Sequence, residues 1–126
     1  MVKYFLGISM LLVTLLSSCT EEFDQTLLYG DWQADLFLES EQEKEMDISN
    51  MGFTFNAHGV FTYQSNLKYK EAGNYRIERS VLYSTDTLSS QKIEKAVRIT
   101  YITADSLHLL MNNGGIEQKI ILHKLK

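Results

Sequence analysis

The sequence contains no proline, a single cysteine and only seven glycines among its 126 residues. The lack of proline and the modest share of glycine exclude collagen-like chains and proline-rich disordered segments. With one cysteine, no disulfide can form within the chain, and a cysteine-rich metal site is excluded. The length suits one domain, and a domain of about 100 residues can bury a core without disulfides.

Hydrophobic residues make up 44% of the chain and charged residues 22%, which is ordinary for a globular protein. Aromatic residues reach 11%, with seven Tyr and six Phe, and this favours strands over helices. Residues 19–50 carry ten acids and one base, whereas residues 51–126 carry six acids and ten bases. An acidic segment before a mildly basic body argues against nucleic acid as a partner.

The first eighteen residues have the layout of a secretory signal. Lys3 and the amino terminus give a positive start, an uncharged run follows over residues 4–16, and Ser17 and Ser18 are small. The apolar run is shorter than the ~18 residues expected of a membrane-spanning helix. A short uncleaved membrane helix or a buried helix of the domain is the alternative interpretation.

Leu16-Ser17-Ser18-Cys19 resembles the lipobox of bacterial lipoproteins. The resemblance implies cleavage before Cys19, a thioether-linked diacylglyceryl group on its sulfur, and usually a further acyl chain such as palmitate. Two or more chains anchor a protein stably, because each buried methylene contributes about 0.8 kcal/mol. We therefore expect a lipoprotein signal peptide over residues 1–18 and an acidic tether over residues 19–27.

The acidic residues directly after Cys19 look like the surface-export signal of Bacteroidetes lipoproteins. A simple solvated tether explains the same residues equally well. Position 20 is Thr rather than Asp, so the inner-membrane retention signal of enteric bacteria is not matched. The expected location is the outer membrane, facing either the periplasm or the cell surface.

Apolar side chains recur at every second position from residue 31 onward, which is typical of strands. The pattern predicts that Trp32, Ala34, Leu36 and Leu38 share one face of the first strand. Turn signals at residues 56–59 and 112–115 separate later strands, and residues 39–47 read as a charged loop or frayed edge strand. About eight short strands at 8–12-residue spacing predict an all-β domain over residues 28–126. A small antiparallel up-and-down barrel is favoured, with an open sandwich as the alternative and a monomer as the expected state.

Gly30-Asp31-Trp32 carries the Gly-x-Trp signature of the lipocalin superfamily, and residues 54–61 are similar to a hairpin of lipocalin-like lipoproteins from Bacteroidetes. The resemblance implies a barrel in which Gly30 and Trp32 are structural. In that family the tryptophan packs across the closed end, often under a basic side chain of the last strand. Here the last predicted strand lacks arginine, so Lys119 or Lys124 would supply the cation–π contact.

Motifs for catalysis are missing from the sequence. The three histidines, His58, His108 and His123, match no metal-binding spacing, and the last two are predicted to face solvent. Neither a Gly-x-Ser-x-Gly elbow nor a phosphate-binding glycine loop occurs. We therefore expect no enzyme activity, no metal and no cofactor.

Six aromatic residues are candidates for a ligand cavity, although they could instead fill the core. They are Phe53, Phe55, Phe61, Tyr63, Tyr75 and Tyr101. An eight-stranded barrel is just wide enough to be filled by side chains or to hold one small ligand. The leading hypothesis is a membrane-anchored, lipocalin-like protein that binds a small apolar or amphipathic molecule. The alternative is an interaction module, of inhibitor or immunity type, that binds a protein or glycan through its loops. In that case Glu41, Glu43 and Glu45 would dock a basic partner.

Overall fold

The computed structural model describes residues 23–65 and 68–126. The predicted signal peptide, the predicted lipidation site Cys19 and the first residues of the tether lie outside the described residues. The predicted boundary at residue 28 falls at the end of a short 3-10 helix, η1 (Gln25–Leu28). Asp24 caps this helix, because its carboxylate accepts a hydrogen bond of 2.9 Å from the backbone N–H of Thr26.

Strands make up most of the described chain. They are β1 (Gly30–Glu39), β2 (Gln42–Glu43), β3 (Gly52–Phe55), β4 (Val60–Gln64), β5 (Lys70–Glu78), β6 (Val81–Asp86), β7 (Glu94–Ile102), β8 (Ser106–Asn113) and β9 (Ile116–Lys124). Sequential neighbours from β3 to β9 pair antiparallel, β1 pairs with β3, and β9 pairs back with β1. The prediction of an all-β, antiparallel up-and-down barrel is therefore confirmed, with eight strands in the closed ring and the two-residue β2 beside β1. A closed ring leaves no long sheet edge exposed.

Tight turns connect the strands where the sequence predicted them. The side chain of Asn56 accepts hydrogen bonds from the backbone N–H groups of His58 and Val60, both at 2.9 Å. At the β8–β9 turn, Gly114 and Gly115 have φ values of 60° and 88°, which side chains other than glycine rarely adopt. Both turns hold consecutive strands in register, as an up-and-down barrel requires.

A bulge at Asp35 in β1 changes which side chains point inward. The pairing of β1 with β9 shifts between Ala34 and Leu36, so one extra residue lies in β1. Trp32, Ala34 and Phe37 are consequently buried, whereas Leu36 is only half-buried. The prediction that Leu36 and Leu38 share a face with Trp32 is therefore wrong, because the bulge reverses the alternation.

A second bulge lies in β7, between Ile99 and Tyr101. Val97 and Ile99 point into the barrel and are buried, but past the bulge Tyr101 is 51% exposed. Its ring lies against His108 on the outer surface, with ring centroids 4.8 Å apart. Tyr101 therefore does not line the interior, and the extra residue in β7 is the physical reason.

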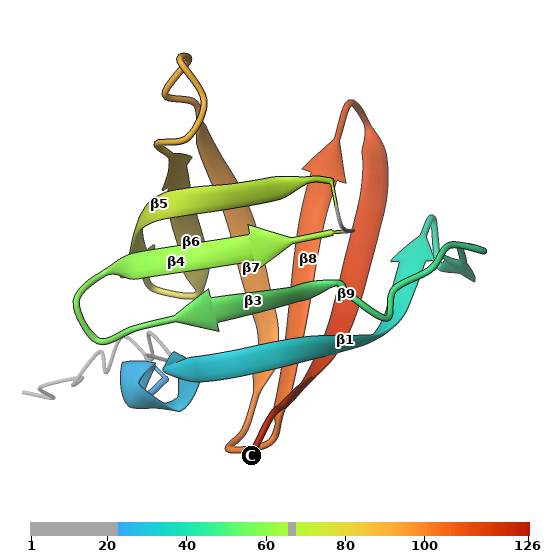
Figure 1. Ribbon diagram of the computed structural model, residues 1–126. Helices are drawn as coiled ribbons and strands as arrows, with labels where there is room; N and C mark the ends of the chain where they lie inside the picture. The colour runs from blue at the N-terminus through green and yellow to red at the C-terminus, as the bar shows by residue number, and fades with distance from the viewer. Residues whose placement is uncertain (1–22, 66–67) are drawn as a thin grey trace, which may run out of the picture.

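The two ends of the barrel differ. Figure 1 shows η1 and the C-terminus at the lower end of the view, and the β6–β7 loop and the β8–β9 turn at the upper end. We call the first the η1 end and the second the mouth. Leu28 of η1 is fully buried against the core, so this helix covers the barrel at its own end.

Candidate functional site

The η1 end of the barrel is filled by side chains. Trp32, Phe55 and Phe61 are each at most 2% exposed. The indole N–H of Trp32 donates a 2.8 Å hydrogen bond to the carbonyl of Leu28, which ties η1 to β1. Two of the six predicted cavity aromatics, Phe55 and Phe61, therefore belong to the packed core.

Lys124 supplies the basic group over the tryptophan. Its ammonium lies 5.0 Å from the centre of the Trp32 ring and donates a 2.9 Å hydrogen bond to the carbonyl of Leu27. Lys119 instead lines a hollow with Glu41 and Glu117. The predicted cation–π contact is thus present, and it involves Lys124.

Gly30 lies beside the stem of that lysine. A Cβ atom at position 30 would be in ordinary van der Waals contact with Cε of Lys124, at 3.4 Å. The φ of Gly30 is 132°, which side chains other than glycine rarely adopt. The glycine of the Gly-x-Trp pattern thus has a local structural reason in the backbone conformation.

Toward the mouth, the interior contains a cavity of about 320 Å³. Its apolar wall consists of Phe37, Met51, Phe53, Val97, Met111 and Ile120. Its polar side chains are Lys44, Ser65, Tyr63, Tyr69, Glu71, Ser84, Lys95 and Gln118, and Met46 completes the lining. Small-molecule sites range over roughly 300–1,000 Å³, so this cavity has the volume for one small ligand.

Glu71 is the buried acid of the polar wall. Only 7% of the residue is exposed, and its Oε1 accepts a 2.7 Å hydrogen bond from the hydroxyl of Tyr69 and forms an ion pair with the ammonium of Lys95. A buried carboxylate needs such partners, because an unpaired charge is costly to remove from water. Neighbouring strands bring the group together, since Tyr63 pairs with Glu71 between β4 and β5, and Ser84 pairs with Lys95 between β6 and β7.

The local environment sets the protonation of three groups in this wall. Burial alone would lower the pKa of Lys95, but the hydrogen bond and the charge of Glu71 outweigh it and raise that pKa. The hydrogen bond to Glu71 raises the pKa of Tyr69, and burial raises the pKa of Tyr63. At neutral pH the wall therefore presents an ammonium ion and two neutral phenols.

Sequence reasoning missed Glu71 and Lys95. Glu71 is in phase with Tyr75 and Ile77 on the inner face of β5. Lys95 is likewise in phase with the buried Val97. A charged residue in phase with apolar neighbours was the available signal in both strands.

The remaining predicted aromatics divide between the two parts of the interior. Phe53 and Tyr63 line the cavity, with ring centroids 4.5 Å apart. Tyr75 lies edge-on to Phe55 at 5.2 Å, and its hydroxyl donates to the carbonyl of Asn56. Burial, and then the charge of a neighbouring tyrosine, raises the pKa of Tyr75 to about 12.

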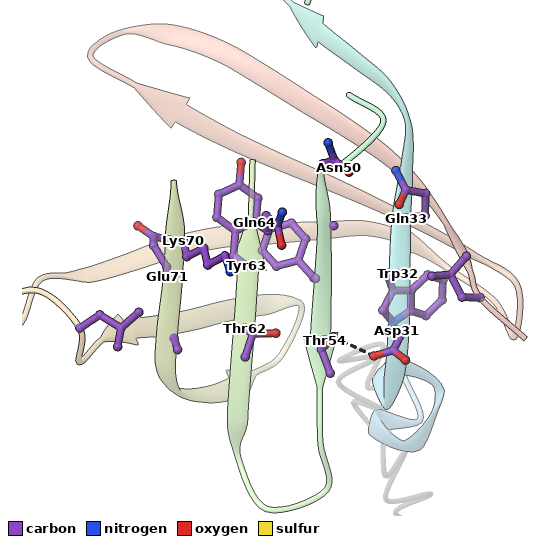
Figure 2. Close-up of a pocket in the computed structure, with 15 residues that line it drawn as sticks. Asp31, Trp32, Gln33, Asn50, Thr54, Thr62, Tyr63, Gln64, Lys70 and Glu71 are labelled. Carbon is purple, nitrogen blue, oxygen red and sulfur yellow. Dashed lines mark hydrogen bonds between the residues drawn. The ribbon is translucent and has the colours of Figure 1, made fainter. Parts of the chain in front are cut away.

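An open groove of about 450 Å³ crosses the outer face of β1, β3, β4 and β5 (Figure 2). The hydroxyl of Thr54 donates a 2.7 Å hydrogen bond to Asp31, shown as a dashed line, and the amide of Gln33 donates to the carbonyls of Ile48 and Ser49. Several polar groups of the groove already bond to the protein itself. The interior cavity is therefore the stronger candidate site.

The histidines lie apart from one another. His58 is exposed in its turn, His108 lies beside Tyr101, and Nδ1 of His123 is 2.6 Å from a carboxylate oxygen of Asp35. Within residues 23–65 and 68–126, no group of three or more His, Cys, Asp or Glu is arranged to hold a metal ion. In the same part of the chain, no helix has the length and apolar character needed to cross a membrane.

The acidic segment after β1 is exposed. Ser40 and Glu41 form a turn with positive φ, β2 follows, and the ammonium of Lys44 is 3.0 Å from the carboxylate of Glu39. Glu41, Glu43 and Glu45 point into solvent. The segment is thus partly a loop and partly a short edge strand, as predicted.

No protein-family model matches the sequence, and a search among curated proteins finds no significant relative. Among solved structures, the fold is similar to that of a lipocalin-like protein from Bacteroides uniformis, with a TM-score of 0.60 and 17% sequence identity. The similarity covers 79% of this chain and 99% of that one. Together with the closed ring of eight antiparallel strands, it shows that the chain has a lipocalin-like barrel fold.

Proposed function

We propose that this protein binds one small apolar or amphipathic molecule inside its barrel and that it is not an enzyme. The observation that carries the proposal is the cavity of about 320 Å³ between an apolar wall and the Glu71–Lys95 pair. Apolar walls with a few placed polar groups are the usual composition of small-molecule sites. The chain also lacks the sequence motifs that would suggest catalysis.

The cavity has the features of a binding site rather than of a packing defect. Its volume is that of about ten water molecules, taking roughly 30 Å³ for each. At the η1 end of the same barrel, by contrast, Trp32, Phe55 and Phe61 are each at most 2% exposed. Met51 and Met111 contribute flexible side chains to its wall, and methionine adapts to ligands of different shape.

Displacement of a fluorescent probe tests the binding proposal. The fragment of residues 20–126 contains all the strands and the whole core described above, so it keeps the barrel intact. We expect the neutral apolar dye N-phenyl-1-naphthylamine to bind it. Met111→Trp should fill part of the cavity and weaken dye binding about tenfold or more. The dye would lose about as much apolar burial as one buried side chain provides, which is worth roughly 1.5–3 kcal/mol.

The matched control is Tyr101→Trp, which places the same side chain on the outer surface. It should leave dye binding unchanged. Equal effects of the two variants, or native mass spectrometry showing neither dye nor a co-purifying molecule in the barrel, would contradict the proposal.

We further propose that Cys19 carries the lipid anchor and that the barrel resides at the outer membrane. Support comes from Leu16-Ser17-Ser18-Cys19 directly after an uncharged apolar run. Labelled palmitate should be incorporated into the wild-type chain but not into Cys19→Ser, and fractionation should release only the variant from membranes. Retention of residues 1–18 in the purified protein would contradict this part of the proposal.

An interaction module is the second candidate function. It is favoured by the exposed carboxylates of Glu41, Glu43 and Glu45 in a segment where Lys44 is the only base. Charge reversal of the three acids should abolish capture of a basic partner from membranes, and high salt should weaken that capture. Capture that survives charge reversal would remove this candidate.

A further inference from the structure

The cavity differs in charge from the chain that surrounds it. The whole sequence has a formal net charge of −4, but the charged residues that line the cavity are Lys44, Lys95 and Glu71. Two bases and one acid therefore line the cavity, and Lys44 is also paired with Glu39 outside it. The ion pair that lies within the lining is Glu71–Lys95.

Glu71 and Lys95 differ in what they can offer to a ligand. The Glu71 side chain is 9% exposed, and its Oε1 already accepts from both Tyr69 and Lys95. The Lys95 side chain is 53% exposed. Its ammonium has three N–H donors, and the ion pair with Glu71 uses one of them. Lys95 can therefore also donate to a group that enters from the mouth.

Solvent reaches this ammonium from two sides. Tyr69, Glu71 and Lys95 line the interior cavity and also a second hollow of about 370 Å³, which Leu88 and Ile93 of the β6–β7 loop help to form. Lys95 thus lies where the apolar interior meets the mouth. Lys44 also lines the cavity, but its charge is already paired with Glu39 at 3.0 Å.

From this arrangement we propose that the cavity selects a single-chain amphiphile with an anionic head, a carboxylate or a phosphate. The head accepts a hydrogen bond from Lys95, and the apolar tail lies against Met51, Phe53 and Met111. Glu71 acts as a positioning residue, because its ion pair holds the lysine at the mouth. This inference rests on the proposed binding function.

Four decyl compounds with different heads test the choice of charge. Decanoate, decyl phosphate, decan-1-ol and decyltrimethylammonium are titrated, below their micelle concentrations, against the fragment of residues 20–126 loaded with N-phenyl-1-naphthylamine. We expect at least one anion to displace the dye about tenfold more tightly than decan-1-ol, since a charge-assisted hydrogen bond is roughly twice as strong as one between neutral groups. The stronger of the two anions identifies the head as carboxylate or phosphate.

Lys95→Met should remove the preference for the anion, measured within that variant as the ratio of the anion's affinity to the affinity for decan-1-ol. The control is Lys92→Met, which removes a lysine that is exposed and does not line the cavity. It should keep the preference. Circular dichroism of Lys95→Met, compared with that of the wild type, checks that the barrel is folded.

The failures of the two proposals are distinguishable. Equal affinities for the anions and decan-1-ol, tightest binding of the cation, or an anion preference that persists in Lys95→Met would each overturn the anionic head and leave the binding function intact. Absence of dye binding to the wild-type fragment, with no decyl compound detected by calorimetry, would overturn the binding function itself.

Discussion

Replacing Lys124 by methionine should destabilise the barrel by about 2 kcal/mol. The change removes a hydrogen bond to the carbonyl of Leu27 and a cation–π contact with Trp32. It keeps the unbranched stem that packs beside Gly30. The loss is therefore confined to the charged group, and the packing of the η1 end should be preserved.

The magnitude follows from two terms. A hydrogen bond from a charged donor contributes roughly 1.5–3 kcal/mol, and a cation–π contact at a partly exposed site adds about 0.5–1 kcal/mol. Lys124 is only half-buried, so the lower end of each range applies. For a domain of this size, about 2 kcal/mol corresponds to a fall of roughly 8–16 °C in Tm.

Urea unfolding of residues 20–126, followed by circular dichroism, measures the difference. Lys119→Met is the matched control, because it makes the same chemical change on the same strand away from Trp32. The control should shift the free energy of unfolding by less than about 0.5 kcal/mol. Indistinguishable unfolding curves for the two variants would refute the role assigned to Lys124.

Three further outcomes are expected. Gly30→Ala should lower the free energy of unfolding by about 1–2 kcal/mol in urea titrations, because alanine is strained at a φ of 132°; an unchanged midpoint would contradict this. Burial, and then the charge of Tyr29, raises the pKa of Tyr75 from 10.0 to about 12. The unfolded chain therefore loses this proton first, and stability should fall as pH rises from 10 to 12. Unfolding midpoints at pH 8 and pH 11 should show a smaller fall for Tyr75→Phe than for the wild type. Phe55→Ala should lower the free energy of unfolding by about 3–5 kcal/mol in thermal unfolding, because it leaves a hole in the packed core. Phe53→Ala should lower it less and should weaken dye binding more, since Phe53 lines the cavity. The reverse order would contradict the assignment of Phe53 to the cavity and Phe55 to the core.

The sequence was sufficient to predict the barrel but not its two bulges. Alternation and the Asn/Gly turns are local signals, so the strand ring and its hairpins could be predicted. Leu36, Phe37 and Leu38 are three apolar residues in a row, and such a run fits either phase of a strand. The phase is decided by pairing with β9, which is remote in the sequence.

The cavity was harder to predict than the barrel because alternation gives the face of a side chain and not its depth. Phe53 and Phe55 are both in phase with the interior, yet one lines the cavity and the other fills the core. The Glu71–Lys95 pair joins β5 to β7 across an intervening strand. Its members are separated by 24 positions in the sequence, so only the closed barrel brings them together.

The position of η1 gives the anchored protein an orientation. Leu27 and Leu28 lie at the end opposite the mouth, where their carbonyls accept hydrogen bonds from Lys124 and Trp32, and Phe23 packs against the same core. If Cys19 carries the lipid, three residues lie between it and Phe23, so at most about 14 Å of chain separates the lipidated residue from the closed end of the barrel. The mouth of the barrel would then point away from the membrane. A bound ligand would exchange with the surrounding solvent rather than with the lipid bilayer.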